Sequence, residues 1–421
     1  MNGARVASSS VCRFFRSNGE EIHFVDGFGG KVEDSEGRTY VDFVLGSGPV
    51  VIGHRNSRFQ QLLASHLVGP LHLPGYAATH ERLAMSVADP EFDEVVGFFK
   101  HSSDAITAAI RLATHRTERF GVIRCGYIGW HDALIAKTPR WHEQLTSPLR
   151  GEVRFEGHFR GVSGSERVFN WVDLELGSLA KELEGRGNDY ACLVIDTYQF
   201  HHAARDRFAA AVEMCRSQGI LVVADETKTA GRVAPRGVFA KEGLPRADMT
   251  VLGKAISNGA PLSLLVGSRE IMSLYPAAAI SGTHCKELFG PYAAMATAQV
   301  MSERSGYEVL ADVGDRVVST FNDAARSEGI AGCVQAVQVL GGSMFDLTFA
   351  DELLGQAGRR QALARVMADE GVLLLQGHPS FVCLDQADLD WDRLGRAFAR
   401  ALRSWTSGGE GMSLRTEGNE R

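Results

Sequence analysis

Residues 220–237 read ILVVADETKTAGRVAPRG, and residues 247–268 read ADMTVLGKAISNGAPLSLLVGS. The first segment begins with an apolar run that ends just before Asp225, and a second apolar run ends just before Gly253 and Lys254. Short apolar runs bounded by polar and glycine residues are typical of strands buried in a sheet. Because ligands of open parallel sheets bind at the carboxyl ends of the strands, Asp225 and Lys254 stand where a ligand site is expected.

The same alternation of short apolar runs and helical stretches extends along most of the chain. Further strands are expected at residues 96–100, 120–127 and 193–196, with helices from about residue 104 and over 205–219. Strands that alternate with helices predict a parallel α/β sheet that is covered on both faces.

The pattern changes after about residue 300. Helices are expected at about 294–328 and 357–370, and strands around 334–340, 344–349 and 372–375. This mixture predicts a smaller α+β domain. Near the N-terminus, residues 29–43 alternate in polarity around Glu36-Gly37, which predicts a hairpin.

Composition narrows the class of protein. The chain has 421 residues, with 44 Lys and Arg against 51 Asp and Glu, so its net charge is −7. A chain of this length needs no disulfide or metal to stabilise its core. It has no basic run of the kind that nucleic-acid binding requires, so no nucleic-acid partner is expected. It also has no apolar stretch of the ~18–20 residues that cross a membrane, so no membrane partner is expected.

The cysteines and the N-terminal segment point to a cytoplasmic protein. The opening residues contain no apolar core of signal-peptide length. Seven scattered cysteines form no C-x-x-C pair, which fits reduced thiols and predicts no metal site. The motifs of dehydrogenases, P-loop nucleotidases, zinc proteases and α/β hydrolases are absent.

Asp225 and Lys254 suggest a specific chemistry. A lysine directly after a buried strand suits a Schiff base with a carbonyl cofactor, and a nearby carboxylate suits the nitrogen of a pyridine ring. The alternative is an ordinary Asp and Lys, solvated in loops at strand ends. The spacing of 29 residues leaves both interpretations open.

The two segments resemble the signature of class III (fold-type I) aminotransferases. The family pattern D-E-x-x-T-G-x-R corresponds to DETKTAGR here, and G-K-x-x-x-x-G-x-P corresponds to GKAISNGAP. Four other segments resemble family motifs in the same order along the chain, namely GRTYVDFVLGSGPVVIGH (37–54), SSDAITAAIRLAT (102–114), GYIGWHD (126–132) and SGTHCKE (281–287).

The resemblance implies the fold-type I architecture of pyridoxal-phosphate-dependent transferases. A large domain at residues 51–300 would bind the cofactor on a mixed or parallel sheet between helices. Residues 1–50 and 301–405 would form the smaller α+β domain, and residues 406–421 read as a disordered tail.

The resemblance also implies roles for individual residues. Lys254 would form the Schiff base with pyridoxal 5′-phosphate and move the proton, and Asp225 would pair with the pyridine nitrogen. Tyr127 would stack on the ring, although it could equally be a core residue.

The phosphate site and the assembly follow from the same resemblance. Ser102 and Ser103 begin a helix and would bind the phosphate, although they could also be an ordinary helix cap. Thr283 would reach the phosphate of the neighbouring subunit. A homodimer with shared active sites is therefore expected.

Departures from the family indicate the substrate. The arginine motifs that bind a substrate carboxylate in glutamate semialdehyde aminomutases and ω-amino-acid transaminases are missing, and Asp196-Thr197 replaces the usual Glu-Pro. Lys228 gives a D-E-x-K pattern that resembles the aminotransferases of aminoglycoside pathways of the neomycin and gentamicin type. The expected reaction is transfer of an amino group between a small-molecule amine and keto substrate, with an amino sugar or aminoglycoside intermediate of antibiotic biosynthesis as acceptor. The acidic net charge favours the approach of a cationic sugar.

Cys285 leaves a second reaction open. A thiol on the cofactor face opposite Lys254 would return a proton to the other side, so the enzyme would be an epimerase or an aminomutase acting at an amine-bearing carbon. The alternative is that Cys285 is a small buried apolar residue. A cofactor-binding regulator without turnover is a third hypothesis.

Overall fold

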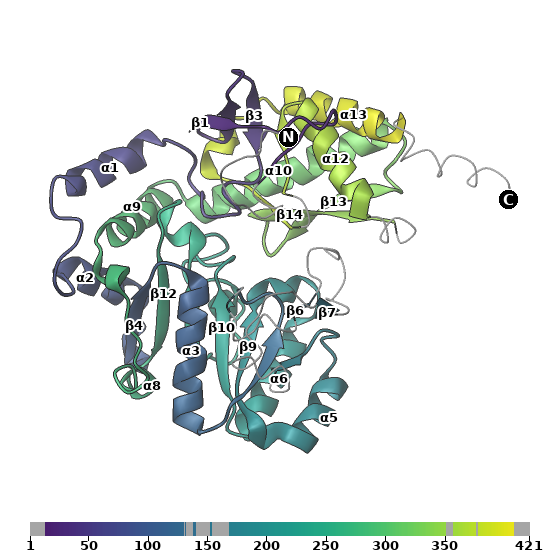
Figure 1. Cartoon of the computed structure of the whole chain (residues 1–421). Coiled ribbons are helices and arrows are strands. Elements are labelled where there is room, and N and C mark those ends of the chain that lie inside the picture. The colour runs from purple at the N-terminus through teal and green to yellow at the C-terminus, as the bar shows by residue number, and fades with distance from the viewer. Residues whose placement is uncertain are drawn as a thin grey trace. The chain divides into compact units, whose positions relative to one another are not determined.

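The computed structural model describes residues 13–129, 131, 138–139, 152–153, 168–350, 357–375 and 378–407. The chain divides into two compact units (Figure 1). The first comprises the described residues up to Ser47, Ile52–Asn56 and those from Glu308 onward. The second comprises Gly48–Val51 and Ser57–Tyr307, and it contains the segments that carry the predicted site.

The second unit is built on a seven-stranded sheet. In spatial order its strands are β4 (Glu94–Phe99), β12 (Ser263–Ser268), β11 (Met249–Leu252), β10 (Leu221–Glu226), β9 (Tyr190–Asp196), β5 (Gly121–Cys125) and β8 (Val168–Asn170). The strands from β11 to β8 are parallel, whereas β12 runs antiparallel to both β11 and β4. The sheet is therefore mixed, and the predicted fold-type I α/β class is confirmed.

Helices cover both faces of this sheet. α3 (Ser102–Thr117) packs across β4, β12, β11, β10 and β9, and α6 (Arg205–Ser217) packs against β10 (Figure 1). Successive residues of β10 enter different cores, because side chains alternate along a strand. Val223 packs in the core that includes residues of α3, and Val222 packs in the core that includes Phe208 of α6.

The remaining helices of this unit are short or lie at its edges. They are α1 (Ser57–Leu67), α2 (Ala78–Val87), α5 (Leu176–Arg186), α7 (Val238–Lys241), α8 (Arg269–Met272) and α9 (Phe289–Glu303). A two-stranded ladder joins β6 (Thr138–Pro139) to β7 (Glu152–Val153).

The single helix predicted at about 294–328 is wrong, because two helices occupy this stretch. α9 ends at Glu303, and α10 (Gly306–Ser327) begins three residues later. Ser305 between them has a φ of +46°, a left-handed conformation that interrupts a right-handed helix. Apolar periodicity continues across the break, so the sequence pattern did not reveal it.

The first unit joins the two ends of the chain in one sheet. Its strands are β1 (Phe24–Phe28), β2 (Lys31–Asp34), β3 (Thr39–Asp42) and β15 (Val372–Leu373). The predicted hairpin is confirmed as β2 and β3, and Gly37 in its turn has a φ of +77°. Parallel pairing of β15 with β3 ties the C-terminal part of the chain to the N-terminal hairpin.

A second sheet and three helices complete the first unit, with α10 belonging to it from Glu308 onward. The sheet contains β13 (Val334–Val339), β14 (Met344–Phe349) and β16 (Ser380–Phe381), and α12 (Ala357–Asp369) packs against α13 (Trp391–Ser407). Most of the predicted tail lies outside the described residues, since these end at residue 407. Among the helices that the structure describes, none has the length and apolarity to cross a membrane.

Candidate active site

Lys254 lies two residues beyond the carboxyl end of β11. It begins the 3₁₀ turn Lys254–Ser257 and has a φ of +50°, which is unusual for a residue other than glycine. Burial, followed by the like charge of Lys228, lowers the pKa of Lys254 to about 8. A lysine with this pKa presents a neutral, nucleophilic amine at neutral pH far more often than an ordinary lysine does.

Asp225 lies near the carboxyl end of β10 and is only 4% exposed. One carboxylate oxygen accepts hydrogen bonds from the Thr227 N–H at 3.0 Å and from the Thr227 hydroxyl. Burial and the neighbouring Asp196 carboxylate raise the pKa of Asp225 to about 6. Asp225 also contributes to the electrostatic environment of Lys254, so the structure brings the two predicted residues to one site.

Tyr127 follows β5 and lies at the same edge of the sheet. Its N–H donates to Asp196 Oδ2 at 3.3 Å, and its ring centroid lies 5.7 Å from Lys228 Nζ. The preceding Gly126 has a φ of +88°, and a Cβ there would lie 2.7 Å from the Cβ of Asp196. A glycine is therefore required for the chain to bring Tyr127 to this place.

Ser102 and Ser103 form the first turn of α3. The residue before them, His101, makes no side-chain capping hydrogen bond. Two glycines pack against the serine hydroxyls: a Cβ at Gly253 would overlap Ser102 Oγ, and a Cβ at Gly129 would lie 2.6 Å from Ser103 Oγ. The N-terminus of α3 thus adjoins both the Lys254 segment and the turn after Tyr127.

These residues fit pyridoxal 5′-phosphate. A helix N-terminus with two hydroxyls suits a phosphate. A buried carboxylate suits a protonated pyridine nitrogen, and a lysine with a lowered pKa suits a carbonyl carbon. The two glycine contacts leave no room for a side chain at Gly253 or Gly129, so the backbone itself borders the site.

Thr283 and Cys285 lie in the same unit, on the 3₁₀ turn Thr283–Lys286. Thr283 is exposed, and its carbonyl accepts from His72 Nε2 at 2.9 Å. Burial raises the pKa of the Cys285 thiol, and the charges of Lys100 and Asp104 also act on it. Asp104 directly follows Ser102 and Ser103 in the first turn of α3, so the Cys285 thiol lies within electrostatic reach of the N-terminus of α3.

The sequence analysis did not predict that Lys228 and Asp196 form an ion pair close to Tyr127 and Asp225. Lys228 and Asp196 form an ion pair, with Nζ 2.5 Å from Oδ2, and their side chains are 7% and 2% exposed. Lys228 Nζ also lies 5.3 Å from the ring centroid of Tyr198. Asp196 and Asp225 are direct neighbours in the register of two parallel strands, and this register is the signal that would have revealed the group.

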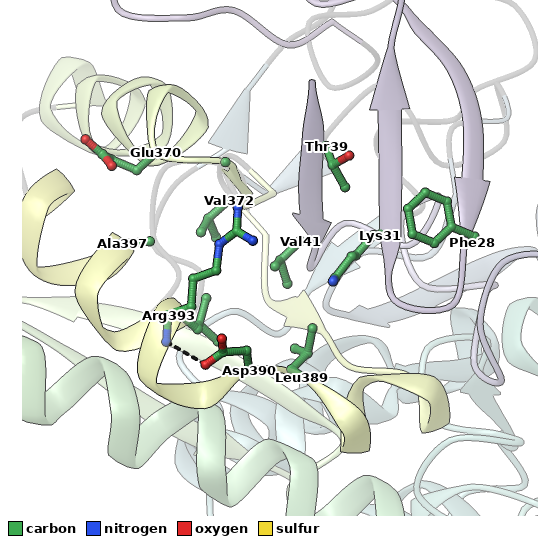
Figure 2. A pocket seen from close by; sticks show the side chains of 12 residues that line it. Phe28, Lys31, Thr39, Val41, Glu370, Val372, Leu389, Asp390, Arg393 and Ala397 are labelled. Atoms are coloured by element: carbon green, nitrogen blue, oxygen red, sulfur yellow. Dashed lines mark hydrogen bonds between the residues drawn. The ribbon is translucent and has the colours of Figure 1, made fainter. Parts of the chain in front are cut away.

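A separate cavity of about 290 Å³ lies in the first unit. Figure 2 shows Lys31 and Arg393 on either side of Val41, with Val372 and Ala397 also in the wall. None of the predicted site residues line this cavity. The candidate active site therefore rests on the second unit alone.

Comparison with known proteins identifies the family. The family model Aminotransferase class-III matches residues 16–387. Glutamate-1-semialdehyde 2,1-aminomutase of Thermus thermophilus is 27% identical over 359 residues, covering 82% of this chain and 81% of the relative. 2′-Deamino-2′-hydroxyneamine transaminase of Streptomyces kanamyceticus is 27% identical over 388 residues, covering 89% of both chains.

Solved structures agree with the fold. A structure described as a transaminase with PLP bound superposes with a TM-score of 0.83 at 20% identity, covering 96% of this chain and 95% of the other. The predicted resemblance, cofactor and enzyme class are confirmed together. The chain belongs to the class III aminotransferases and is a pyridoxal 5′-phosphate-dependent enzyme.

Proposed function

We propose that this enzyme is an aminotransferase that moves an amino group onto an oxidised carbon of an amino sugar, namely an aminoglycoside intermediate of antibiotic biosynthesis. The observation that carries the aminotransferase chemistry is Lys254, whose pKa is lowered to about 8 beside the buried Asp225 carboxylate. A group with this pKa both accepts and returns a proton near neutral pH, as a general acid–base catalyst must.

Each residue of the site has a proposed part in this reaction. When bound, pyridoxal 5′-phosphate supplies a carbonyl that captures the amine and a ring that withdraws electrons from the reacting carbon. Lys254 holds it covalently and then carries the proton on Nζ. Asp225 pairs with the ring nitrogen, and Tyr127 contacts the ring face. The hydroxyls of Ser102 and Ser103, with the N-terminus of α3, hold the phosphate.

The amino-sugar substrate rests on three observations. One relative at 27% identity is named a 2′-deamino-2′-hydroxyneamine transaminase. The net charge of −7 favours approach of a polycation. Arg232, the arginine of the signature motif, is 1% exposed and donates to the Gly48 carbonyl at 2.8 Å. That arginine therefore supports the chain rather than a substrate carboxylate.

We propose a homodimer as the catalytic unit. Thr283 is exposed in the single chain, on the 3₁₀ turn Thr283–Lys286. In a dimer, Thr283 would reach the phosphate held by the partner. The epimerase alternative needs the same arrangement, because Cys285 would have to approach Lys254 of the other subunit.

The test combines an amino donor, a ketone of an aminoglycoside and deuterated water. The proposal predicts a product in which an amino group has replaced the ketone oxygen, formed only with donor present and lost in Lys254→Ala. Cys285→Ala should retain this activity. Deuterium at a retained C–N carbon without a donor, abolished by Cys285→Ala, would instead establish the epimerase. A Lys254→Ala protein that keeps the visible absorption of the bound cofactor would overturn the assignment of Lys254.

A further inference from the structure

The Lys228–Asp196 ion pair is buried beside the proposed cofactor site. Ion pairs at this depth give little net stability, because the cost of removing both charges from water offsets their attraction. The pair lies directly beside the groups assigned to the cofactor. Its contacts therefore suggest what it does there.

Tyr127 is held by this pair in two ways. Asp196 Oδ2 accepts the Tyr127 N–H at 3.3 Å, and Lys228 Nζ lies 5.7 Å from the centroid of the Tyr127 ring. The same oxygen, Asp196 Oδ2, accepts a hydrogen bond from Lys228 Nζ at 2.5 Å. One carboxylate oxygen therefore binds both the backbone of Tyr127 and the Lys228 ammonium group. The pair also contacts Tyr198. Lys228 Nζ lies 5.3 Å from the centroid of the Tyr198 ring, and the Tyr198 N–H donates a hydrogen bond to Asp196 Oδ1 at 3.2 Å.

The pair also sets the charge around the reacting groups. The Lys228 cation lowers the pKa of Lys254 and opposes the rise in the pKa of Asp225, whereas the Asp196 anion raises both. Arg232 acts on Lys254 in the same direction as Lys228.

His202 also faces Lys228. Burial, His201 and Lys228 together lower its pKa to about 4, so it stays neutral in the working range. Lys228 is thus a cation that pairs with Asp196 and acts on the buried Asp225 carboxylate, in surroundings that also contain Lys254, Arg232 and Arg124.

We propose that Lys228, through Asp196 and the Tyr127 ring, is a positioning residue of the cofactor site that orients the aromatic face and balances the charge between Asp225 and Lys254. This inference rests on the proposed roles of Lys254, Asp225 and Tyr127. It goes beyond them because it assigns a function to two residues that make no proposed contact with cofactor or substrate.

The first experiment measures Lys254 in the apoenzyme. Acylation of Lys254 by acetic anhydride is followed by peptide mass spectrometry from pH 6 to 11. In the wild type the half-maximal rate is expected at about pH 8. Lys228→Met should move it upward by about one pH unit, because the nearby cation that lowers the pKa of Lys254 is lost while the Asp196 carboxyl group, which raises it, remains. Lys181→Met removes the same charge from an exposed position on α5 and should leave the midpoint unchanged.

The second experiment keeps the inference testable if Lys228→Met does not fold. The variant Lys228→Met/Asp196→Asn removes both charges and avoids an isolated buried carboxylate. Its Lys254 midpoint should return toward the wild-type value. Its holoenzyme should release pyridoxal phosphate faster by roughly three- to thirtyfold, the range of a cation–π contact. In a Tyr127→Leu background the same two changes should add little, since they act through the ring.

The outcomes separate this inference from the proposed function. A wild-type midpoint near that of an ordinary lysine would refute the assignment of Lys254 itself. A midpoint near pH 8 that is the same in Lys228→Met and Lys181→Met would refute only the role of Lys228. Cofactor release from the double variant at the wild-type rate would do the same.

Discussion

Gly126→Ala is the smallest change that tests how the site is built. Gly126 has a φ of +88°, and its added Cβ would lie 2.7 Å from Asp196 Cβ and 3.0 Å from Gln199 Cγ. The left-handed backbone costs an alanine about 1–2 kcal/mol. Displacing Asp196 also weakens its charge-assisted hydrogen bond to Lys228 while both groups stay buried, and the loss of such a bond costs about 1.5–3 kcal/mol even where the intact pair adds little net stability. The expected loss is therefore about 2.5–5 kcal/mol.

Thermal unfolding of the apoenzyme measures this loss. For a unit of this size, the midpoint should fall by roughly 5–20 °C. The holoenzyme should also lose cofactor on gel filtration, because Tyr127 and Asp196 move together. The matched control is Gly185→Ala on α5, where a Cβ meets nothing within 4 Å. That change should stabilise the helix by about 0.5–1 kcal/mol. Equal stability and equal cofactor retention in the two variants would refute the reasoning.

Three further predictions follow from the site. Asp225→Asn should fold but retain pyridoxal phosphate poorly, because an amide does not hold the ring nitrogen protonated; retention equal to wild type after dialysis would contradict its role. The rate of cofactor incorporation into the apoenzyme should rise with pH, reach half its maximum near pH 8 and level off about one pH unit higher, because the reacting amine must be neutral and the pKa of Lys254 is lowered to about 8. A rate still rising toward pH 10 would contradict this. Gly237→Ala should lower the free energy of unfolding by more than about 1 kcal/mol in denaturant unfolding, because Gly237 has a φ of +86° and a Cβ there would overlap Glu226 Oε2. The control is Gly177→Ala, since a Cβ at Gly177 meets nothing within 4 Å.

Short apolar runs bounded by polar and glycine residues were sufficient to predict most strands of the central sheet. The strands ending near Asp225 and Lys254 lie where the apolar runs placed them, because both faces of these strands are buried. The break at Ser305 could not be predicted, since a single left-handed residue leaves apolar periodicity intact. The antiparallel course of β12 was equally hidden, because a short apolar run carries no sign of direction.

The candidate site could be predicted from the sequence only where a single residue is unusual in its position. Lys254 and Asp225 stand out in a sequence because a buried charge at a strand end is unusual. Lys228 entered the sequence analysis only as part of a D-E-x-K pattern, and Asp196 only as a departure from a motif. Their pairing depends on the register that sets Asp196 beside Asp225, which one sequence does not reveal.

The signature segment therefore combines two kinds of residue. Glu226 is fully buried and accepts from the N–H groups of Val238 and Phe239 and from the Thr197 hydroxyl, so it anchors the start of α7. Arg232 holds the Gly48–Val51 segment through two carbonyls.

Scaffold residues of this kind are required for the fold whatever the substrate, because removing a partner from a buried polar group costs stability. Asp225 and Lys228 lie in the same segment, and the parts proposed for them are at the cofactor site instead. Replacing Lys228 is therefore expected to change the cofactor site while Glu226 and Arg232 keep the surrounding loop in place.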